Sequence, residues 1–257
     1  NNVTLNDVNA LDLGASTVSG NLNITASGAL TDSGTLTVGG TATLAVGAGN
    51  DISLNNADDF ATVVIASAKD VTLSDVNALD LGASTVSGNL NVTTSGALTD
   101  SGTVSVGGTA TLAAGSGNDI ILNNADDFAT AAITSANNVT LNDVNALNLG
   151  ASTVSGNLGV TANGAITDSG TLAVAGTTTL TAGTGNNITF DNADNFNTVA
   201  IVSANNVTLN DANALNLGSS AVSGSLNVTA NGAITDSATV TVGGTATFAA
   251  GAGNDIT

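Results

Sequence analysis

The chain has 257 residues, and its composition already excludes several functions. Its 20 acidic residues are all Asp, Lys69 is the only basic residue, and the formal net charge is -19. One basic side chain cannot neutralise a nucleic-acid backbone or attach a protein to an anionic membrane surface. No apolar run approaches the ~20 residues of a membrane-spanning helix, and no Cys is present to form disulfides or thiolate metal sites. We therefore expect no nucleic-acid partner and no membrane insertion.

A 68-residue repeat organises the chain. The segment VTLNDVNALDLGASTVSG begins at Val3, and close copies begin at Val71, Val139 and Val207 without insertion or deletion. Repeats therefore start near residues 1, 69, 137 and 205, and the fourth is incomplete. Such a period predicts a solenoid in which each repeat contacts its neighbours. We expect residues 1–257 to form a single continuous solenoid, and the lack of polar caps predicts an interior segment of a longer chain or filament.

Within one repeat, apolar residues alternate over short spans with the period of two that is typical of β-strands. Nine such strands are expected in the first repeat, in three rows of three that start at Val3, Leu11 and Val18, at Leu22, Leu30 and Leu36, and at Leu44, Ile52 and Val63. We interpret each row as one coil with three faces. The chain would then contain about eleven coils and measure on the order of 50 Å along its axis. Corresponding valines of successive repeats would lie on one line, ~14 Å apart.

Gly, Asn, Asp and Ser separate the strands and are predicted to form the corners, because they tolerate positive φ or make Asx turns. Predicted corners lie at Ser19-Gly20, Ser27-Gly28, Gly39-Gly40 and Gly47–Asn50. The third coil has surplus residues, which we assign to a loop over Asn55–Phe60 (NNADDF), anchored by its phenylalanine. Helices are disfavoured because Thr, Val, Gly, Asn and Asp are poor helix formers. The predicted fold class is therefore all-β, a parallel β-helix or β-solenoid with three coils in each repeat.

The residues needed for catalysis are scarce. A nucleophilic triad requires a base, but the chain has no His, and the counterparts of Lys69 are Asn137 and Asn205. The pairs Asp58-Asp59 and Asp126-Asp127 could serve as acid and base, but neighbouring strand residues point to opposite faces. We expect no enzyme activity, no catalytic residues and no cofactor.

Calcium binding is a weaker alternative. The segment GAGNDI at Gly47–Ile52 is similar to the nonapeptide of calcium-binding β-rolls, but it occurs once per repeat instead of every nine residues. Several acids become Asn in later repeats, which indicates a need for turn-forming side chains more than for charge. Asp7 and Asp32 keep their acid in all four repeats and Asp58 in all three available. We expect corner hydrogen bonding and no metal site, with weak divalent-ion binding at the Asp58 loop left open.

The surface also carries two short sequence patterns, Thr-x-Thr and Asn-x-Thr. Thr-x-Thr pairs such as Thr41/Thr43 could order water on an ice-binding face, but Thr does not recur on the first face of every coil. Thr is also simply a favoured strand residue. The Asn-x-Thr acceptor pattern for glycosylation is short, and chance explains it in a chain rich in both residues. It occurs at Asn2, Asn23, Asn91, Asn138, Asn187, Asn206 and Asn227.

The Gly/Asn corners, the Val-x-Leu strands and the long near-identical repeats resemble the repeat regions of large bacterial exoproteins, of the filamentous-haemagglutinin-like or autotransporter-type adhesin class. The resemblance covers all of the chain and rests on composition and coil pattern. It implies a right-handed parallel β-helix, export to the cell surface, and structural or adhesive work, including cell adhesion and biofilm formation. The chain departs from that class in its long repeat and in its near lack of basic residues.

These observations predict a non-enzymatic structural rod, the interior of an extracellular fibre or adhesin stalk. The expected partners are other copies of the chain, end to end or side by side, or neighbouring repeats, and a host or cell-surface receptor. The alternative is a surface binding module for ice, glycan or weakly bound calcium. A binding module should carry one regular face on every coil, whereas a spacer need not. With three coils in each repeat, no face of this chain is expected to be regular on every coil.

Overall fold

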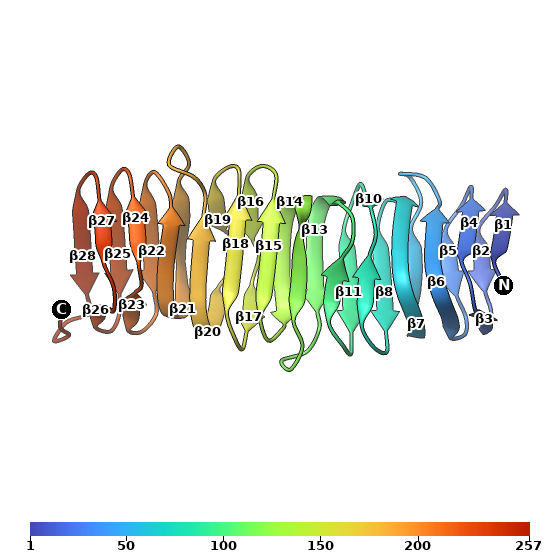
Figure 1. The fold of residues 1–257 in the computed structure, drawn as a ribbon, viewed down its shortest axis with the longest axis horizontal. Coiled ribbons are helices and arrows are strands. Elements are labelled where there is room, and N and C mark those ends of the chain that lie inside the picture. Colours follow the sequence, from blue (N-terminus) through green and yellow to red (C-terminus); the bar gives the residue numbers. More distant parts are fainter. The chain divides into compact units, whose positions relative to one another are not determined.

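The computed structural model describes residues 1–257, which consist of strands, turns and bends without any helix. No helix is therefore available that could cross a membrane. Residues 1–130 and 131–257 form two compact units, called unit 1 and unit 2 below. In each unit the strands lie side by side and short turns join them at both edges (Figure 1).

Unit 1 contains thirteen complete strands: β1 (Val3–Asp7), β2 (Leu11–Leu13), β3 (Ser16–Val18), β4 (Leu22–Ala26), β5 (Leu30–Asp32), β6 (Leu36–Ala45), β7 (Ile52–Ser67), β8 (Val71–Asp75), β9 (Leu79–Leu81), β10 (Ser84–Val86), β11 (Leu90–Thr94), β12 (Leu98–Asp100) and β13 (Val104–Ala113). The next strand, β14 (Ile120–Ser135), begins in unit 1 and ends in unit 2. Unit 2 then contains β15 (Val139–Asp143), β16 (Leu147–Leu149), β17 (Ser152–Val154), β18 (Leu158–Ala162), β19 (Ile166–Asp168), β20 (Leu172–Thr181), β21 (Ile188–Ser203), β22 (Val207–Asp211), β23 (Leu215–Leu217), β24 (Ser220–Val222), β25 (Leu226–Ala230), β26 (Ile234–Asp236), β27 (Val240–Val242) and β28 (Ala246–Ala250).

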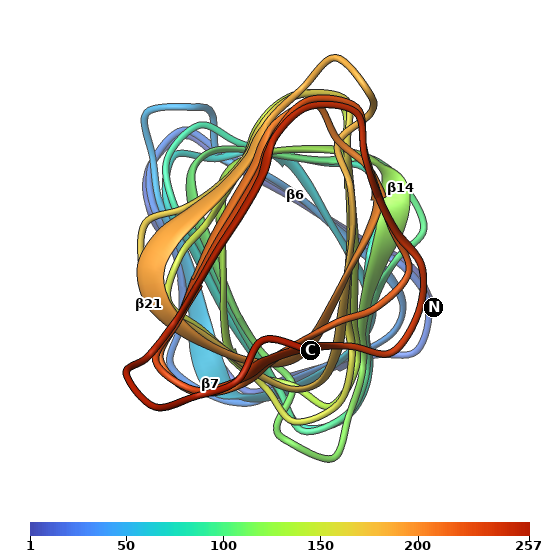
Figure 2. The same cartoon turned by 90° about the vertical axis from the view of Figure 1, so that its left-hand side faces the viewer.

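The strands pair in parallel from coil to coil, which confirms the predicted parallel β-solenoid. β1 pairs with β4, and β4 pairs with the second half of β6, in continuous register. In unit 2, β15, β18 and β20 repeat this arrangement. Seen from the end, the coils of each unit lie behind one another around a common interior (Figure 2).

The number of coils in a repeat differs from the prediction. One column of paired residues in unit 1 runs through Val3, Leu22, Ala42, Val63, Leu81 and Asp100, which is five coils over 97 residues. In this column one coil takes between 18 and 21 residues, so a 68-residue repeat makes about three and a half coils, not three. The residues that we assigned to a surplus loop in the third coil belong to this extra half coil.

The half coil moves corresponding residues to different faces. Val3 belongs to the column that continues through Leu22, whereas Val71 pairs with Ile52, Ile52 with Leu30, and Leu30 with Leu11. The expectation that Val3 and Val71 share one line parallel to the axis was therefore wrong. Within unit 1, the second repeat has its long strands on the faces opposite to those that the first repeat uses for them.

The interior of each unit is a stack of aliphatic side chains. The residues that line it alternate with outward ones along the regular strands, as in β4, where Leu22, Ile24 and Ala26 are buried and the two residues between them are exposed. Phe60 and Phe196 are fully buried, which supports their predicted role as anchors. In unit 2, the ring of Phe196 also stacks on that of Phe190, with 5.8 Å between centroids.

The predicted corners hold only in part. Gly47 has a φ of +83° and forms the expected turn, with Asn50 Nδ2 donating to Val46 O at 2.7 Å. Gly39 and Gly40 instead lie inside β6, at a bulge where the register with β7 shifts between Val38 and Thr41. Most other corner glycines have a negative φ, so a left-handed backbone is not the reason for glycine at these positions. The reason is close packing between coils, because an added Cβ would collide with the preceding coil.

Candidate functional site

The most unusual group of side chains surrounds the NNADDF segment in β7. This segment is not the loop that we expected, because it continues the strand through a bulge. Leu54 pairs with Leu73 and Asp58 with Asp75, so that Asn55, Asn56 and Ala57 stand opposite one residue of β8. A bulge leaves backbone groups without ladder partners. In this protein, carboxylates supply many of those partners.

Asp58 lies in the interior with no exposed surface. Its Oδ1 accepts a hydrogen bond from the backbone N–H of Leu36, in the preceding coil, at 2.8 Å. Its Oδ2 has no hydrogen-bond partner. An ionised carboxylate in such a position is energetically costly, because burial removes its hydration.

Two further carboxyl groups bind the coils on either side of the bulge. Asp32 Oδ1 accepts from the Asn55 N–H at 3.1 Å, and its Oδ2 accepts from Asn56 Nδ2 at 2.6 Å. In the following coil, Asp75 is buried; its Oδ2 accepts from the Phe60 N–H at 2.7 Å and its Oδ1 from the Asn77 N–H at 2.9 Å. The three acids thus join successive coils where the regular ladder is interrupted.

Unit 2 contains the same arrangement. Asp194 has no exposed surface, its Oδ1 accepts from the Leu172 N–H at 2.7 Å, and its Oδ2 has no hydrogen-bond partner. Asp168 accepts from Asn192 Nδ2 at 2.7 Å, and Asp211 accepts from the Phe196 N–H at 2.8 Å. The site is therefore a property of the repeat.

The electrostatics follow from burial among like charges. Desolvation raises the pKa of Asp58 to about 6, against the lowering effect of the Leu36 N–H, and the nearby carboxyls of Asp32 and Asp75 raise it further. Desolvation likewise raises the pKa of Asp194 to about 7. The pKa values of Asp75 and Asp211 are also raised, again chiefly by desolvation. No basic side chain compensates, because Lys69 is exposed and pairs with Asp70 at 2.8 Å and Asp51 at 4.0 Å.

The carboxyl groups that we considered for chemistry are not arranged as an acid–base pair. Asp58 points into the interior, whereas Asp59 is half-exposed and accepts a hydrogen bond from Asn77 Nδ2 at 2.9 Å. This confirms that the two neighbours face opposite sides. No group of three or more acidic side chains is placed to hold a metal ion.

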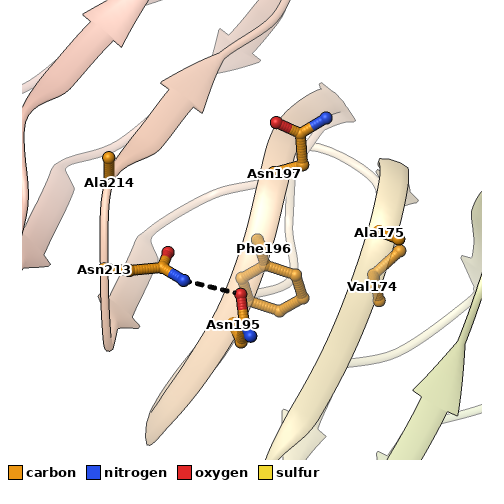
Figure 3. A pocket seen from close by; sticks show the side chains of 7 residues that line it. All are labelled: Val174, Ala175, Asn195, Phe196, Asn197, Asn213 and Ala214. Carbon is orange, nitrogen blue, oxygen red and sulfur yellow. Dashed lines mark hydrogen bonds between the residues drawn. The ribbon is translucent and has the colours of Figure 1, made fainter.

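A shallow hollow lies on the outer surface of unit 2, above the same segment (Figure 3). Asn213 Nδ2 donates to Asn195 Oδ1 at 2.8 Å across it, and the lining carries no titratable side chain. The aromatic ring below it belongs to Phe196, which is buried and offers no exposed stacking surface. The lining residues are Val174, Ala175, Asn195, Phe196, Asn197, Asn213 and Ala214.

The outward side chains form a more regular array than the sequence suggested. In unit 1, one face carries a small polar residue on each of six successive coils, which we call the outer polar ladder: Asp12, Thr31, Ser53, Thr72, Asn91 and Thr111. Unit 2 has an equivalent ladder: Asn148, Thr167, Thr189, Thr208, Asn227 and Thr247. The statement that no face is regular on every coil was therefore wrong, because it assumed three coils in a repeat.

The Asn-x-Thr positions fall into two groups. In one group the side chain supports the next coil, as Asn2 does by accepting from the Asn21 N–H at 2.9 Å and Asn206 by accepting from the Ser225 N–H at 2.9 Å. In the other group the residue is exposed on the outer side of a strand, as Asn23 and Asn91 are. For the first group, a structural role explains the asparagine.

The burial of the acids was missed in the sequence, although one signal pointed to it. The positions of Asp58 and Asp75 keep their acid in every repeat that contains them, whereas the half-exposed Asp59 is replaced by Asn195 in the third repeat. We interpreted these residues as corner-forming. Their burial depends on the bulge, which becomes visible only when the coils are paired.

The fold and the site define the class of protein, a tandem-repeat parallel β-solenoid whose coils are joined by buried carboxyl groups. A family model for repeats of unknown function (DUF5649) matches residues 1–67, 68–135, 136–203 and 204–257, and the chain belongs to this family. These segments begin within one residue of the predicted repeat starts and confirm the tandem repeat. No curated protein gives a match to the chain, and no solved structure does either.

Proposed function

We propose that this chain is a non-enzymatic structural rod, a segment of an extracellular fibre or adhesin stalk in which β-solenoid coils carry mechanical load along the axis. The main support is the unbroken parallel pairing in each unit. In unit 1 every coil binds the next through backbone hydrogen bonds, from β1 through β4 and β6 to β7. Bonds that run along the axis resist extension together, which suits a load-bearing spacer.

The surface charge supports the same proposal. The net charge of -19 makes copies of the chain repel each other side by side at low ionic strength. End-to-end contact is opposed less, because many backbone hydrogen bonds form at once. The partners that this proposal implies are further coils, either of the same chain or of another copy, and the proposed location is the cell surface or the outside of the cell.

Small-angle scattering and negative-stain electron microscopy of the 257-residue chain test the rod. If the coils continue without a bend, about twelve coils at ~4.8 Å give a particle on the order of 60 Å long. End-to-end assembly predicts longer particles of the same width at higher concentration. A globular particle, or one that widens with concentration instead of lengthening, would contradict the proposal.

The outer polar ladder favours one alternative, a surface binding module for ice, glycan or weakly bound calcium. Its residues repeat on every coil of unit 1, as a periodic ligand would require. Against an ice-binding face, β2 and β5 have only three residues and contribute one outward side chain each, so a second column is missing. Ice-recrystallisation and glycan-array assays would support this alternative if activity is lost when Thr31 and Thr72 are both replaced by Lys.

A further inference from the structure

The unpartnered oxygen of Asp58 requires an explanation. It lies in the interior, and the titratable groups that act on this carboxyl are Asp32 on β5 and Asp75 on β8. The other group bonded to it is the Leu36 N–H of β6. Asp194 has a similar environment, in which the carboxyl groups of Asp168, Asp211 and Asp191 act on it. Both positions contain acids without a compensating cation.

A proton resolves the imbalance. When Asp58 is ionised, its unpartnered oxygen stays unsolvated, and its charge adds to that of the nearby Asp32 carboxyl. When a hydronium ion gives its proton to Oδ2 and leaves as water, the Asp58 carboxyl gains an O–H donor, and the Asp32 carboxylate is the neighbouring group that can accept it. The charge on the pair then falls from two to one, and the Leu36 N–H keeps its acceptor, Oδ1. The proton returns to solvent hydroxide or water when the group ionises.

The internal repeats suggest that the titratable group itself is needed. The next residue is acidic in the first two repeats and becomes Asn195 in the third, yet the interior residue is Asp in all three. A carboxamide at the interior position would be permanently neutral, and its NH2 group would bring two N–H donors that need acceptors. Only a carboxyl group can change its charge there.

We propose that Asp58 and Asp194 are proton-operated latches, which hold the bulged segment to the preceding coil when protonated and loosen it when ionised. Asp32 is the partner of the first latch and Asp168 that of the second. Because Asp32 also binds Asn55 and Asn56, repulsion between the two carboxylates weakens the attachment of the bulge. The latch is a regulatory device that adds to the proposed structural function and does not depend on it.

The direction of the pH effect follows from the shifted titration. The pKa of Asp58 rises from 3.8 to about 6 in the folded chain and that of Asp194 to about 7, so the folded state holds these protons more firmly than the unfolded chain. The resulting contribution to the free energy of unfolding is complete below about pH 4 and is lost as the pH rises through 6 and 7. The fold should therefore be more stable in mild acid than at alkaline pH.

The first test compares melting temperatures at pH 5 and pH 8 in fixed salt. The unmodified chain should melt at least about 5 °C lower at pH 8, and the double variant Asp58→Asn, Asp194→Asn should lose most of that difference. The control is the double variant Asp59→Asn, Asp127→Asn, which removes two carboxyl groups at half-exposed positions. The third repeat already has asparagine there, because Asn195 occupies this position and accepts a hydrogen bond from Asn213. An equal pH effect in the unmodified chain and the double variant would overturn the proposal.

The second test needs no variant and covers the case in which the double variant fails to fold. The side-chain carboxyl carbons, observed by carbon-13 NMR, should show Asp58 and Asp194 titrating between about pH 6 and pH 7. Titration of both below pH 4.5 would overturn the proposal. So would a recovery of stability at pH 8 on adding millimolar calcium or magnesium that equals the effect of acid, because a cation would then be the ligand of these carboxyl groups.

Discussion

At the scale of single residues, the backbone donors of a carboxyl group explain why Asp75 stays an acid where Asp59 can be replaced by asparagine. Asp59 uses one oxygen to accept from Asn77, and Asn195 does the same with Asn213. Asp75 instead uses both oxygens to accept backbone N–H groups. An amide has only one acceptor oxygen, so asparagine suits the first kind of position and fails at the second.

Thr178 offers a direct test of polar burial. It has no exposed surface, and its hydroxyl has no hydrogen-bond partner, whereas the first two repeats place Ala42 and Ala110 at this position. Because an unpaired buried hydroxyl costs about 1–3 kcal/mol, we expect Thr178→Val to raise the free energy of unfolding by about 1 kcal/mol. Urea denaturation followed by circular dichroism measures the change.

The neighbouring Thr177 supplies the control for this prediction. It is half-exposed, so Thr177→Val should change the free energy of unfolding by less than about 0.5 kcal/mol. A loss of stability in Thr178→Val would mean that the hydroxyl has a partner, such as a buried water molecule.

At the scale of elements, close contact between coils determines the turns. Gly28, Gly96, Gly164 and Gly232 occupy the same turn in the four repeats, and a Cβ on each would lie 2.6 to 2.7 Å from the backbone nitrogen of an alanine in the preceding coil. The glycines therefore allow the turns to stack. A side chain there would separate the coils at one edge.

We accordingly expect Gly96→Ala to lower the free energy of unfolding by about 1–3 kcal/mol, because the added methyl group collides with the backbone of Ala78. Chemical denaturation again measures the change. Gly117→Ala is the matched control, since a Cβ at that position would meet nothing within 4 Å and the residue has no positive φ. Equal effects of the two substitutions would show that backbone entropy, not contact between the coils, decides the result.

The bulges are the second feature at this scale. The bulge at Asn55–Ala57 in β7 and the one at Gly39-Gly40 in β6 let coils of different length stack in one column. β7 and its counterpart β21 curve round an edge of their units (Figure 2). Asp32 and Asp58 accept hydrogen bonds from backbone N–H groups and thereby stabilise this irregular part of the coil.

At the scale of the molecule, the acidic surface raises the question of calcium. We expect millimolar calcium to change the melting temperature by less than about 2 °C beyond the effect of sodium chloride at equal ionic strength. The reason is that no group of three acidic side chains is placed to hold a metal ion, and that Asp32 and Asp75 already use both oxygens for protein hydrogen bonds. Differential scanning calorimetry measures the melting temperature, and a calcium-specific rise of more than about 10 °C would contradict this expectation.

The sequence alone was sufficient for the repeat and the fold class. The nine strands expected in the first repeat are seven in the structure, because bulged segments join two pairs of them into β6 and β7. Strand positions follow from local alternation, and an uninterrupted 68-residue period is compatible with parallel coils that stack residue on residue. The buried aliphatic columns, such as Leu30 on Ile52, follow from the same alternation because the side-chain period of a strand is two. The expectation of one continuous solenoid over 1–257 and the right hand of the helix stay predictions.

Only the tertiary structure decided how the repeat closes into coils. The alternation of apolar and polar residues shows which side chains lie on the same face of a strand. The number of residues in one coil depends instead on bulges and on pairing between residues about 20 positions apart. For this reason the half coil was missed, and with it the outer polar ladder. The same non-local pairing turns Asp58 inward and leaves Asp59 outside, so two adjacent identical letters in the sequence have opposite environments in the fold.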